Sequence, residues 1–314
     1  MFLSTLVAIL IISLVVADPI PQRGAVSEGP IGYGASTTGG GNGGGITVTS
    51  CSALSAAAGK GGNVIKIQGV LPGCGVIKVG GSTTIQGVGA NSGLKDGGLI
   101  IKRVSNVIIR NIKFDTPTEK GDALSLDRAT KVWIDHCEFK SKGKAVNKDY
   151  YDGLLDITHG CDQVTVSWSK FSDHWKGSLV GHSDKNSEED TGKLHVTFHH
   201  NHWNNVNSRL PSIRFGTGHM FSSCFENTPT SGINARMGAQ VLVEESHFRN
   251  VTLPIVTNLS SKVEGLATSK NNIFENGEAR ITKPAALSIP YKYTTDPAAT
   301  ICELLSAKAG VGHI

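Results

Sequence analysis

Apolar and polar positions along the chain alternate in short runs that recur at regular intervals. Four eight-residue segments share one template, which is apolar at positions 1 and 3 and aromatic at position 8; they are residues 107–114, 132–139, 164–171 and 196–203. Weaker copies follow at residues 218–225, 241–248 and 267–274. The successive starts are 25, 32, 32, 22, 23 and 26 residues apart. Alternation with a period of two predicts strands rather than helices.

A strand template with a period in the twenties indicates a solenoid, because one coil cannot bury its apolar face until a neighbour stacks on it. We therefore expect an all-β fold, a parallel β-helix with Val, Ile and Phe ladders pointing inward and the position-8 aromatic rings stacked. A β-sandwich is the main alternative, but it would not place one template at this interval. The two 32-residue spacings contain insertions, which in solenoids form loops on one face that often binds ligands.

Composition supports short strands joined by turns. The chain has 314 residues with 38 glycines, and charged residues make up 18%, below the usual value of about 25%. The formal net charge of +4 comes without a basic block of the kind that nucleic-acid binding requires, so we expect no nucleic-acid partner. A mildly basic chain is compatible with a polyanionic carbohydrate, and we expect it to act as a monomer.

The amino terminus predicts export. Residues 1–17 contain an apolar run followed by small residues, which is typical of a secretory signal peptide and too short for the ~20 residues of a membrane span. We expect a secreted, extracellular protein without a membrane partner after cleavage. Residues 18–45 form a Gly-rich lead-in that we interpret as a flexible linker, and we expect residues 46–314 to form one parallel β-helix domain. Two sequons could carry glycans if the secretory route is eukaryotic: Asn250 and Asn258.

Six cysteines in an exported chain are expected to pair, and their spacing contains no CxxC motif that would indicate zinc. Cys51 and Cys74 flank an Ala-rich segment that predicts a helix capping the first coil, so we expect them to form one disulfide. The other four leave their connectivity open. Our working assignment has an outward-facing Cys224 hold the C-terminal tail, which leaves one further pair: Cys224–Cys302 and Cys137–Cys161.

Three aspartates that do not fit the core come close together when successive coils are aligned on their strand templates. Asp122 lies ten residues before the 132–139 template, and Asp152 and Asp156 lie twelve and eight before the 164–171 template. Coils stack about 4.8 Å apart, so the carboxylates would repel one another unless a cation lies between them. Ca²⁺ takes 6–8 oxygen ligands and fits such a set. The alternative is that each aspartate caps a turn or pairs with a nearby lysine.

Cations stack in the same way on neighbouring coils. Lys176 lies twelve residues after the start of one template, Arg209 lies thirteen after the start of the next, and Arg214 follows on the same turn beyond Pro211. A row of cations beside a carboxylate cluster suits an acidic sugar polymer. The alternative is that these are ordinary surface cations.

Histidines 199, 200 and 202 resemble a metal cluster in the printed sequence. Alternation along a strand would separate them, so we interpret them as residues of the wall rather than as ligands. His136 and His159 are interpreted as structural in the same way.

Several motifs together resemble the secreted, fungal-type pectate lyases of polysaccharide lyase family 1. They are TSCSALSAAAGKGG, NVIIRNIKF, GDALSLDRATKVWIDHCEF, DGLLDITHGCDQVTVSWSKF and HVTFHHNHWNNVNSRLPSIRFG. The resemblance implies a right-handed parallel β-helix that cleaves α-1,4-linked polygalacturonate by β-elimination, with Ca²⁺ as cofactor, and leaves 4,5-unsaturated oligogalacturonides. It also implies Asp122, Asp152 and Asp156 as calcium ligands.

For the chemistry, the same resemblance implies that Arg209, the first arginine of RLPSIR, is the base, and that Lys176 and Arg214 bind substrate carboxylates. Arginine ordinarily has a pKa above 12, so a basic role predicts an alkaline optimum. The chain departs from some members at Lys120, where they have a further aspartate. We expect weak calcium affinity without substrate, or a slightly rearranged site.

Other functions fit the sequence less well. A pectin lyase acting on methyl-esterified polymer would lack the three aspartates. A polygalacturonase would need paired acids for hydrolysis, and the chain has no adjacent Asp-Asp. A non-catalytic β-helix that binds cell-wall polysaccharide is also conceivable, but it would have no need of both the base and the carboxylates.

Overall fold

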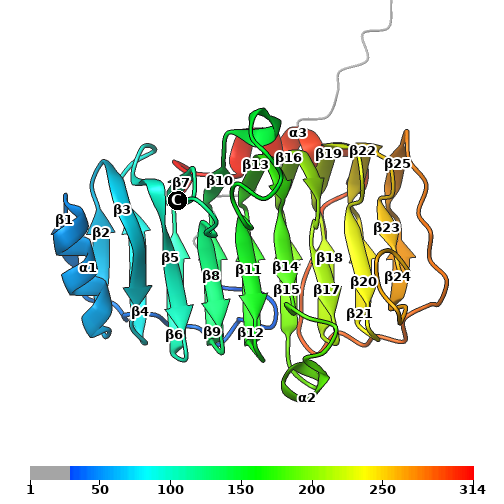
Figure 1. Ribbon diagram of the computed structural model, residues 1–314, viewed down its shortest axis with the longest axis horizontal. Coiled ribbons are helices and arrows are strands. Elements are labelled where there is room, and N and C mark those ends of the chain that lie inside the picture. Colours follow the sequence, from blue (N-terminus) through cyan, green and yellow to red (C-terminus); the bar gives the residue numbers. More distant parts are fainter. Residues whose placement is uncertain (1–28) are drawn as a thin grey trace, which may run out of the picture.

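The computed structural model describes residues 29–314 of the chain. The predicted signal peptide and the start of the lead-in lie outside these residues. The strands are all in parallel register along a single stack of coils, so the predicted parallel β-helix is confirmed (Figure 1). None of the helices in residues 29–314 is long and apolar enough to cross a membrane.

Each coil contributes strands to three faces. One face is a ten-stranded sheet made of β1 (Ile46–Val48), β2 (Val64–Ile67), β4 (Thr83–Gly87), β6 (Ser105–Arg110), β9 (Thr130–Asp135), β12 (Asp162–Ser167), β15 (His195–His199), β18 (Thr217–Phe221), β21 (Gln240–Glu244) and β24 (Leu266–Lys270). The other two faces join through two long strands, β3 (Val70–Val79) and β5 (Gly93–Lys102), into a fifteen-stranded sheet.

Beyond β5 this larger sheet divides into two rows. The second face holds β7 (Lys113–Asp115), β10 (Glu138–Lys140), β13 (Lys170–Lys176), β16 (His202–Ser208), β19 (Cys224–Thr228), β22 (His247–Val251) and β25 (Ile273–Glu275). The third face holds β8 (Leu124–Asp127), β11 (Leu155–Thr158), β14 (Ser178–Val180), β17 (Ser212–Arg214), β20 (Ile233–Arg236) and β23 (Ile255–Val256).

The template explains the register of the coils. Its first residues pair directly from strand to strand, as Val107 does with Val132, Val132 with Val164 and Val164 with Val196. The position-8 rings form a continuous interior stack, in which ring centroids lie 3.9 Å apart for Phe171 and Trp203. Parallel strands about 4.8 Å apart bring identical positions together, so a repeated apolar residue becomes a ladder and a repeated ring a stack. Both predictions are confirmed.

Helices close the solenoid and hold its tail. α1 (Cys51–Lys60) caps the first coils, and the predicted Cys51–Cys74 disulfide ties it to β3. α3 (Ala298–Lys308) packs on the outside of the second face, where Cys224 points away from the core and pairs with Cys302 as predicted. Two short helices lie in loops: η1 (Gly143–Ala145) and α2 (Ser187–Asp190).

The predicted Cys137–Cys161 disulfide is wrong. Both residues are free, buried thiols. Cys161 immediately precedes β12, whereas Cys137 follows the end of the neighbouring β9, so the two lie at opposite ends of paired strands. Six residues of strand span roughly 20 Å, far beyond the ~7 Å that a disulfide allows between Cα atoms. Burial raises the pKa of each thiol to about 12, so both stay protonated.

The described part of the Gly-rich lead-in is also not a free linker. Its backbone runs along the outside of the ten-stranded sheet and donates hydrogen bonds to it, from Tyr33 to the Thr197 hydroxyl and from Gly34 to the Thr165 hydroxyl. Gly32 has a φ of +104° and lies so close to Thr197 that a Cβ would clash with it. Close packing on the sheet therefore requires glycine at this position.

Candidate active site

Two sets of long loops border the third face of the β-helix. The loops of residues 116–123 and 141–154 join the second face to the third, and the loop of residues 181–194, which contains α2, joins the third face to the first. Figure 1 shows them at opposite ends of the same strands, with α2 below and the other loops above. The two 32-residue spacings therefore supply both walls of one surface rather than a single loop cluster.

A cleft of about 410 Å³ lies over this surface. It is lined by Ile100, Asp122, Ser125, Leu126, Asp127, Asp152, Asp156, Thr158, His159, Leu179, His182 and Arg209. Five of these residues are acidic or strongly basic, and all three of the predicted aspartates are among them. The three aspartates therefore converge at one cleft, as their register in the coils predicted.

The three aspartates form a compact cluster in which one carboxylate oxygen of each lies within 4.8 Å of the others. Asp122 is held from two directions, since the Gly153 amide donates to its Oδ1 at 2.7 Å and the Ser125 hydroxyl donates to its other oxygen. Asp156 points out of β11 between two core residues and accepts from the Leu179 amide at 3.1 Å. Asp152, in the preceding loop, is half-exposed.

Electrostatics at this cluster favour a bound cation. Burial, together with neighbouring carboxylates, raises the pKa of Asp122 and raises that of Asp156 well above the ordinary value. Protonation or a cation can relieve this repulsion. Three carboxylates of which one is exposed offer oxygen ligands and leave room for others, which fits a hard divalent ion. The structure thus supports a metal site of this donor set.

Two of the predicted cations lie beside the cluster. The Lys176 ammonium, at the end of β13, is 3.0 Å from Asp152 and 3.6 Å from Asp149. Arg209 follows β16 and faces the cleft, where its positive charge lowers the raised pKa of Asp156. Within residues 29–314 the Arg209 guanidinium makes no ion pair, so it is available to another group.

Arg214 is not part of the cleft lining. Its Nε lies 2.5 Å from Asp184, and its guanidinium also donates to the Gly181 carbonyl at 2.7 Å. In the next coil Arg236 occupies the strand position directly beside Arg214. Burial and the charge of Arg214 lower the pKa of Arg236 to about 10. The structure therefore places Arg214 and Arg236 as neighbouring cations farther along the same face.

Sequence reasoning missed Asp184, Arg236 and the position of His159 at the cleft. Asp184 lies in the loop of residues 181–194, 30 positions from its partner, and no pattern marks it. Arg236 could have been found as the arginine one coil beyond Arg214. His159 and His182 stack at 3.9 Å beside the cleft, where burial and the neighbouring imidazole lower the pKa of His182.

His199 and His200, which the sequence placed in the wall, are buried there. His199 is buried, and the ring of His200 contacts it and the carboxylate of Asp296 in the C-terminal tail. His202 lies near Glu226 and Cys224 in a group that could resemble a metal site. Cys224 is disulfide-bonded and therefore unavailable as a thiolate ligand.

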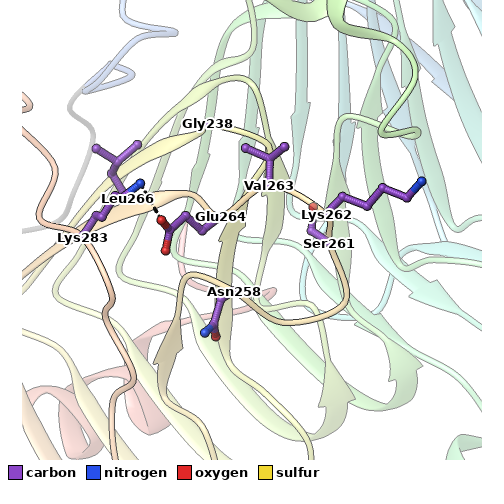
Figure 2. Close-up of a pocket in the computed structure, with 8 residues that line it drawn as sticks. All are labelled: Gly238, Asn258, Ser261, Lys262, Val263, Glu264, Leu266 and Lys283. Atoms are coloured by element: carbon purple, nitrogen blue, oxygen red, sulfur yellow. Dashed lines mark ion pairs between the residues drawn. The ribbon is translucent and has the colours of Figure 1, made fainter.

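A second hollow of about 540 Å³ lies near the C-terminal end of the β-helix (Figure 2). It is lined by Gly238, Asn258, Ser261, Lys262, Val263, Glu264, Leu266 and Lys283. Its one acidic group, Glu264, is paired with Lys283 at 2.5 Å. This hollow has neither a carboxylate cluster nor an unpaired arginine, so the first cleft is the better candidate for catalysis.

Comparison with known proteins decides the family. The family model described as "Pectate lyase" matches residues 3–314. The chain belongs to the pectate lyase family. Pectate lyase B of Colletotrichum gloeosporioides is 45% identical over 88% of this chain and 85% of its own length. Pectate lyase A of Aspergillus niger is 42% identical over 92% of this chain and 90% of its own length.

Solved structures agree with this assignment. A Bacillus pectate lyase in complex with trigalacturonate superposes with a TM-score of 0.80 at 30% identity, covering 91% of this chain and 99% of its own. Pectate lyase II of Xanthomonas campestris gives the same TM-score and coverage at 29% identity. Like the pectate lyases it resembles, the chain is a polysaccharide lyase with a parallel β-helix fold.

Proposed function

We propose that the protein cleaves α-1,4-linked polygalacturonate by β-elimination in the cleft over the third face, with calcium held by Asp122, Asp152 and Asp156. The observation that carries the proposal is the convergence of these three carboxylates beside Arg209, whose guanidinium faces the cleft and has no ion-pair partner among the described residues. The complex of a related enzyme with trigalacturonate supports an acidic substrate of this class.

In the proposed reaction Arg209 removes the C5 proton of a galacturonate residue, which is α to the carboxylate and only weakly acidic. The C5 electron pair forms the C4–C5 double bond while the C4–O4 bond breaks and O4 takes a proton from solvent. Calcium, when bound, supplies Lewis-acid and electrostatic stabilisation of the charge that develops on the carboxylate. Lys176, at the edge of the cluster, offers a second positive charge to that carboxylate.

Arg214 serves as a clamp for a substrate carboxylate in this proposal. Its attachment to Asp184 and to the Gly181 carbonyl fixes the guanidinium on the same face as the acidic cluster. Because a base must be unprotonated, and arginine ordinarily has a pKa above 12, we expect activity to rise towards alkaline pH.

Secretion and N-glycosylation are part of the same proposal. Two disulfides in the described residues fit an oxidising compartment. Both sequon asparagines are exposed, Asn258 in the second hollow and Asn250 in a ladder of asparagines, where it hydrogen-bonds Asn227 and Asn276. Mass spectrometry of protein from a eukaryotic secretory host tests both sites.

The decisive experiment follows the absorbance of the unsaturated product during incubation with polygalacturonate, with calcium and with a chelator. We expect product only with calcium. No product in calcium would refute the lyase proposal, and product that resists chelation and increases on methyl-esterified pectin would indicate a pectin lyase instead.

Two variants test the assigned roles. Arg209→Lys keeps a positive charge but shortens its reach, and Asp156→Asn removes one ligand charge with nearly the same shape. Arg209→Lys should lose at least about a hundredfold in kcat, which is the usual contribution of a positioned acid–base group. Asp156→Asn should lose activity because the calcium site loses one carboxylate ligand. Unchanged circular dichroism serves as the control for folding, and full activity in either variant contradicts the role assigned to that residue.

A further inference from the structure

The loop before the acidic cluster has an unusual charge. Residues 140–148, KSKGKAVNK, contain four lysines and no acidic residue. The whole chain has 30 Lys and Arg against 26 Asp and Glu. Without these four lysines the counts are 26 and 26, so the loop carries a positive charge equal to the net charge of the entire chain.

This loop is held in a defined position. The Ser141 hydroxyl donates to the Asp173 carbonyl at 2.8 Å, and the Gly143 amide donates back to the Ser141 hydroxyl at 3.0 Å. The Trp175 indole donates to the Val146 carbonyl at 2.9 Å, and η1 lies within the loop. The lysines therefore project from a fixed scaffold.

The lysine side chains are available to a ligand. Lys142 and Lys144 are exposed, and neither makes an ion pair within residues 29–314, although Lys142 also hydrogen-bonds the Tyr151 side chain. The two outer lysines have only loose partners, since Lys140 and Lys148 each lie 3.7 Å from an aspartate, with side chains 51% and 70% exposed. Exposed pairs of this kind contribute little to stability, so they do not explain why the lysines cluster.

The loop adjoins the cleft. It leads directly into Asp149 and Asp152, the two carboxylates that contact Lys176. The amide of Lys120, in the other loop of this wall, donates to the Tyr150 carbonyl at 2.8 Å, which adds another exposed lysine alongside. Figure 1 shows this loop standing above β10 and β13, on the upper border of the third face.

We propose that residues 140–148 form a second binding surface for the polyanionic polymer, an exosite that engages a galacturonate segment outside the catalytic cleft. This inference rests on the proposed function for the identity of the polymer. Carboxylates spaced regularly along a flexible chain match exposed ammonium groups spaced along a rigid loop, and such contacts raise the local concentration of substrate at the cleft.

The test compares the double variant Lys142→Ala/Lys144→Ala with a control of equal charge change, Lys60→Ala/Lys292→Ala. The exposed lysines of the control lie in α1 and in the tail that packs on the ten-stranded sheet through Tyr291. Initial rates are measured with polygalacturonate and with hexagalacturonate, at low ionic strength and in about 1 M salt, where the screening length falls to about 3 Å. We expect KM for the polymer to rise about fivefold in the loop variant at low salt, with kcat unchanged. KM for the hexamer should not change, and the control variant should behave as wild type.

A binding measurement separates this inference from the lyase proposal. In an Arg209→Lys background, adsorption to insoluble calcium pectate should fall when Lys142 and Lys144 are removed, whether or not Arg209 is the base. An equal loss for the hexamer and the polymer would place the effect in the cleft and overturn the exosite. An equal effect of the control variant would mean that net charge alone explains the loss of binding, which would overturn the exosite. Unchanged binding of the polymer by the loop variant would also overturn the exosite.

Discussion

Replacing the most buried ligand, as Asp156→Asn, should stabilise the metal-free protein near pH 8. At 4.8 Å two carboxylates repel by about 3.5 kcal/mol for an effective dielectric constant of about 20. Attraction to Lys176, 3.0 Å from Asp152, and to Arg209 offsets part of this repulsion. We therefore expect a net gain of about 2 kcal/mol in the free energy of unfolding, which corresponds to roughly 5 °C in Tm.

The pH dependence has a definite sign. The folded-state pKa values of Asp122 and Asp156 are raised above those of the unfolded chain. Their protonated forms thus contribute stability that is fully present below pH ~4 and lost as pH rises through the raised values. The gain in the free energy of unfolding of Asp156→Asn over the metal-free wild type should therefore appear as pH rises from ~4 through the raised pKa values. It should be absent below pH ~4.

Thermal unfolding in chelator and in calcium, at several pH values, measures both effects. Calcium at about a hundred times its Kd should stabilise the wild type by about 2.7 kcal/mol, and the variant should lose most of that shift. Asp127→Asn is the matched control in the same cleft. Although burial works against it, the hydrogen bond and ion pair with Lys102 lower the pKa of Asp127, so this control should be less stable than wild type.

One outcome would refute the reasoning. If Asp156→Asn unfolds at a lower temperature than wild type in chelator at pH 8, and calcium still shifts its Tm fully, then the cluster neither repels nor binds the ion as inferred.

Three further predictions concern packing and positioning. Trp203→Ala opens the aromatic stack and should cost about 3–5 kcal/mol in urea unfolding, whereas a cost below 1 kcal/mol would mean that the stack contributes little. Cys302→Ser should release α3, seen as faster amide exchange in that helix with kcat unchanged; unaltered exchange would contradict an anchoring role. Asp184→Asn should raise KM several-fold more than it lowers kcat, because Arg214 loses the partner that orients it, and Asp184→Glu should restore part of KM; equal effects on both constants would argue against a positioning role.

Much of the fold could be predicted because a solenoid makes local pattern and tertiary position equivalent. Val132 and Val164 occupy the same template position, so a constant coil rise places one above the other. The same logic brought Asp122 and Asp156 together across 34 residues of sequence. Strand register does not extend into the loops, so the positions and contacts of loop residues were predicted less well.

The sequence by itself determined the repeat, the inward ladders, the ring stack and the acidic cluster, since these follow from the period of two within a strand and the spacing between coils. Only the tertiary structure decided that Cys137 and Cys161 stay apart, that the described lead-in packs on a sheet, and that Arg214 is held by Asp184. Each of these depends on where a loop or a strand end lies in space. A loop has no repeating geometry from which that position can be calculated, and its contacts are set by side chains distant in sequence.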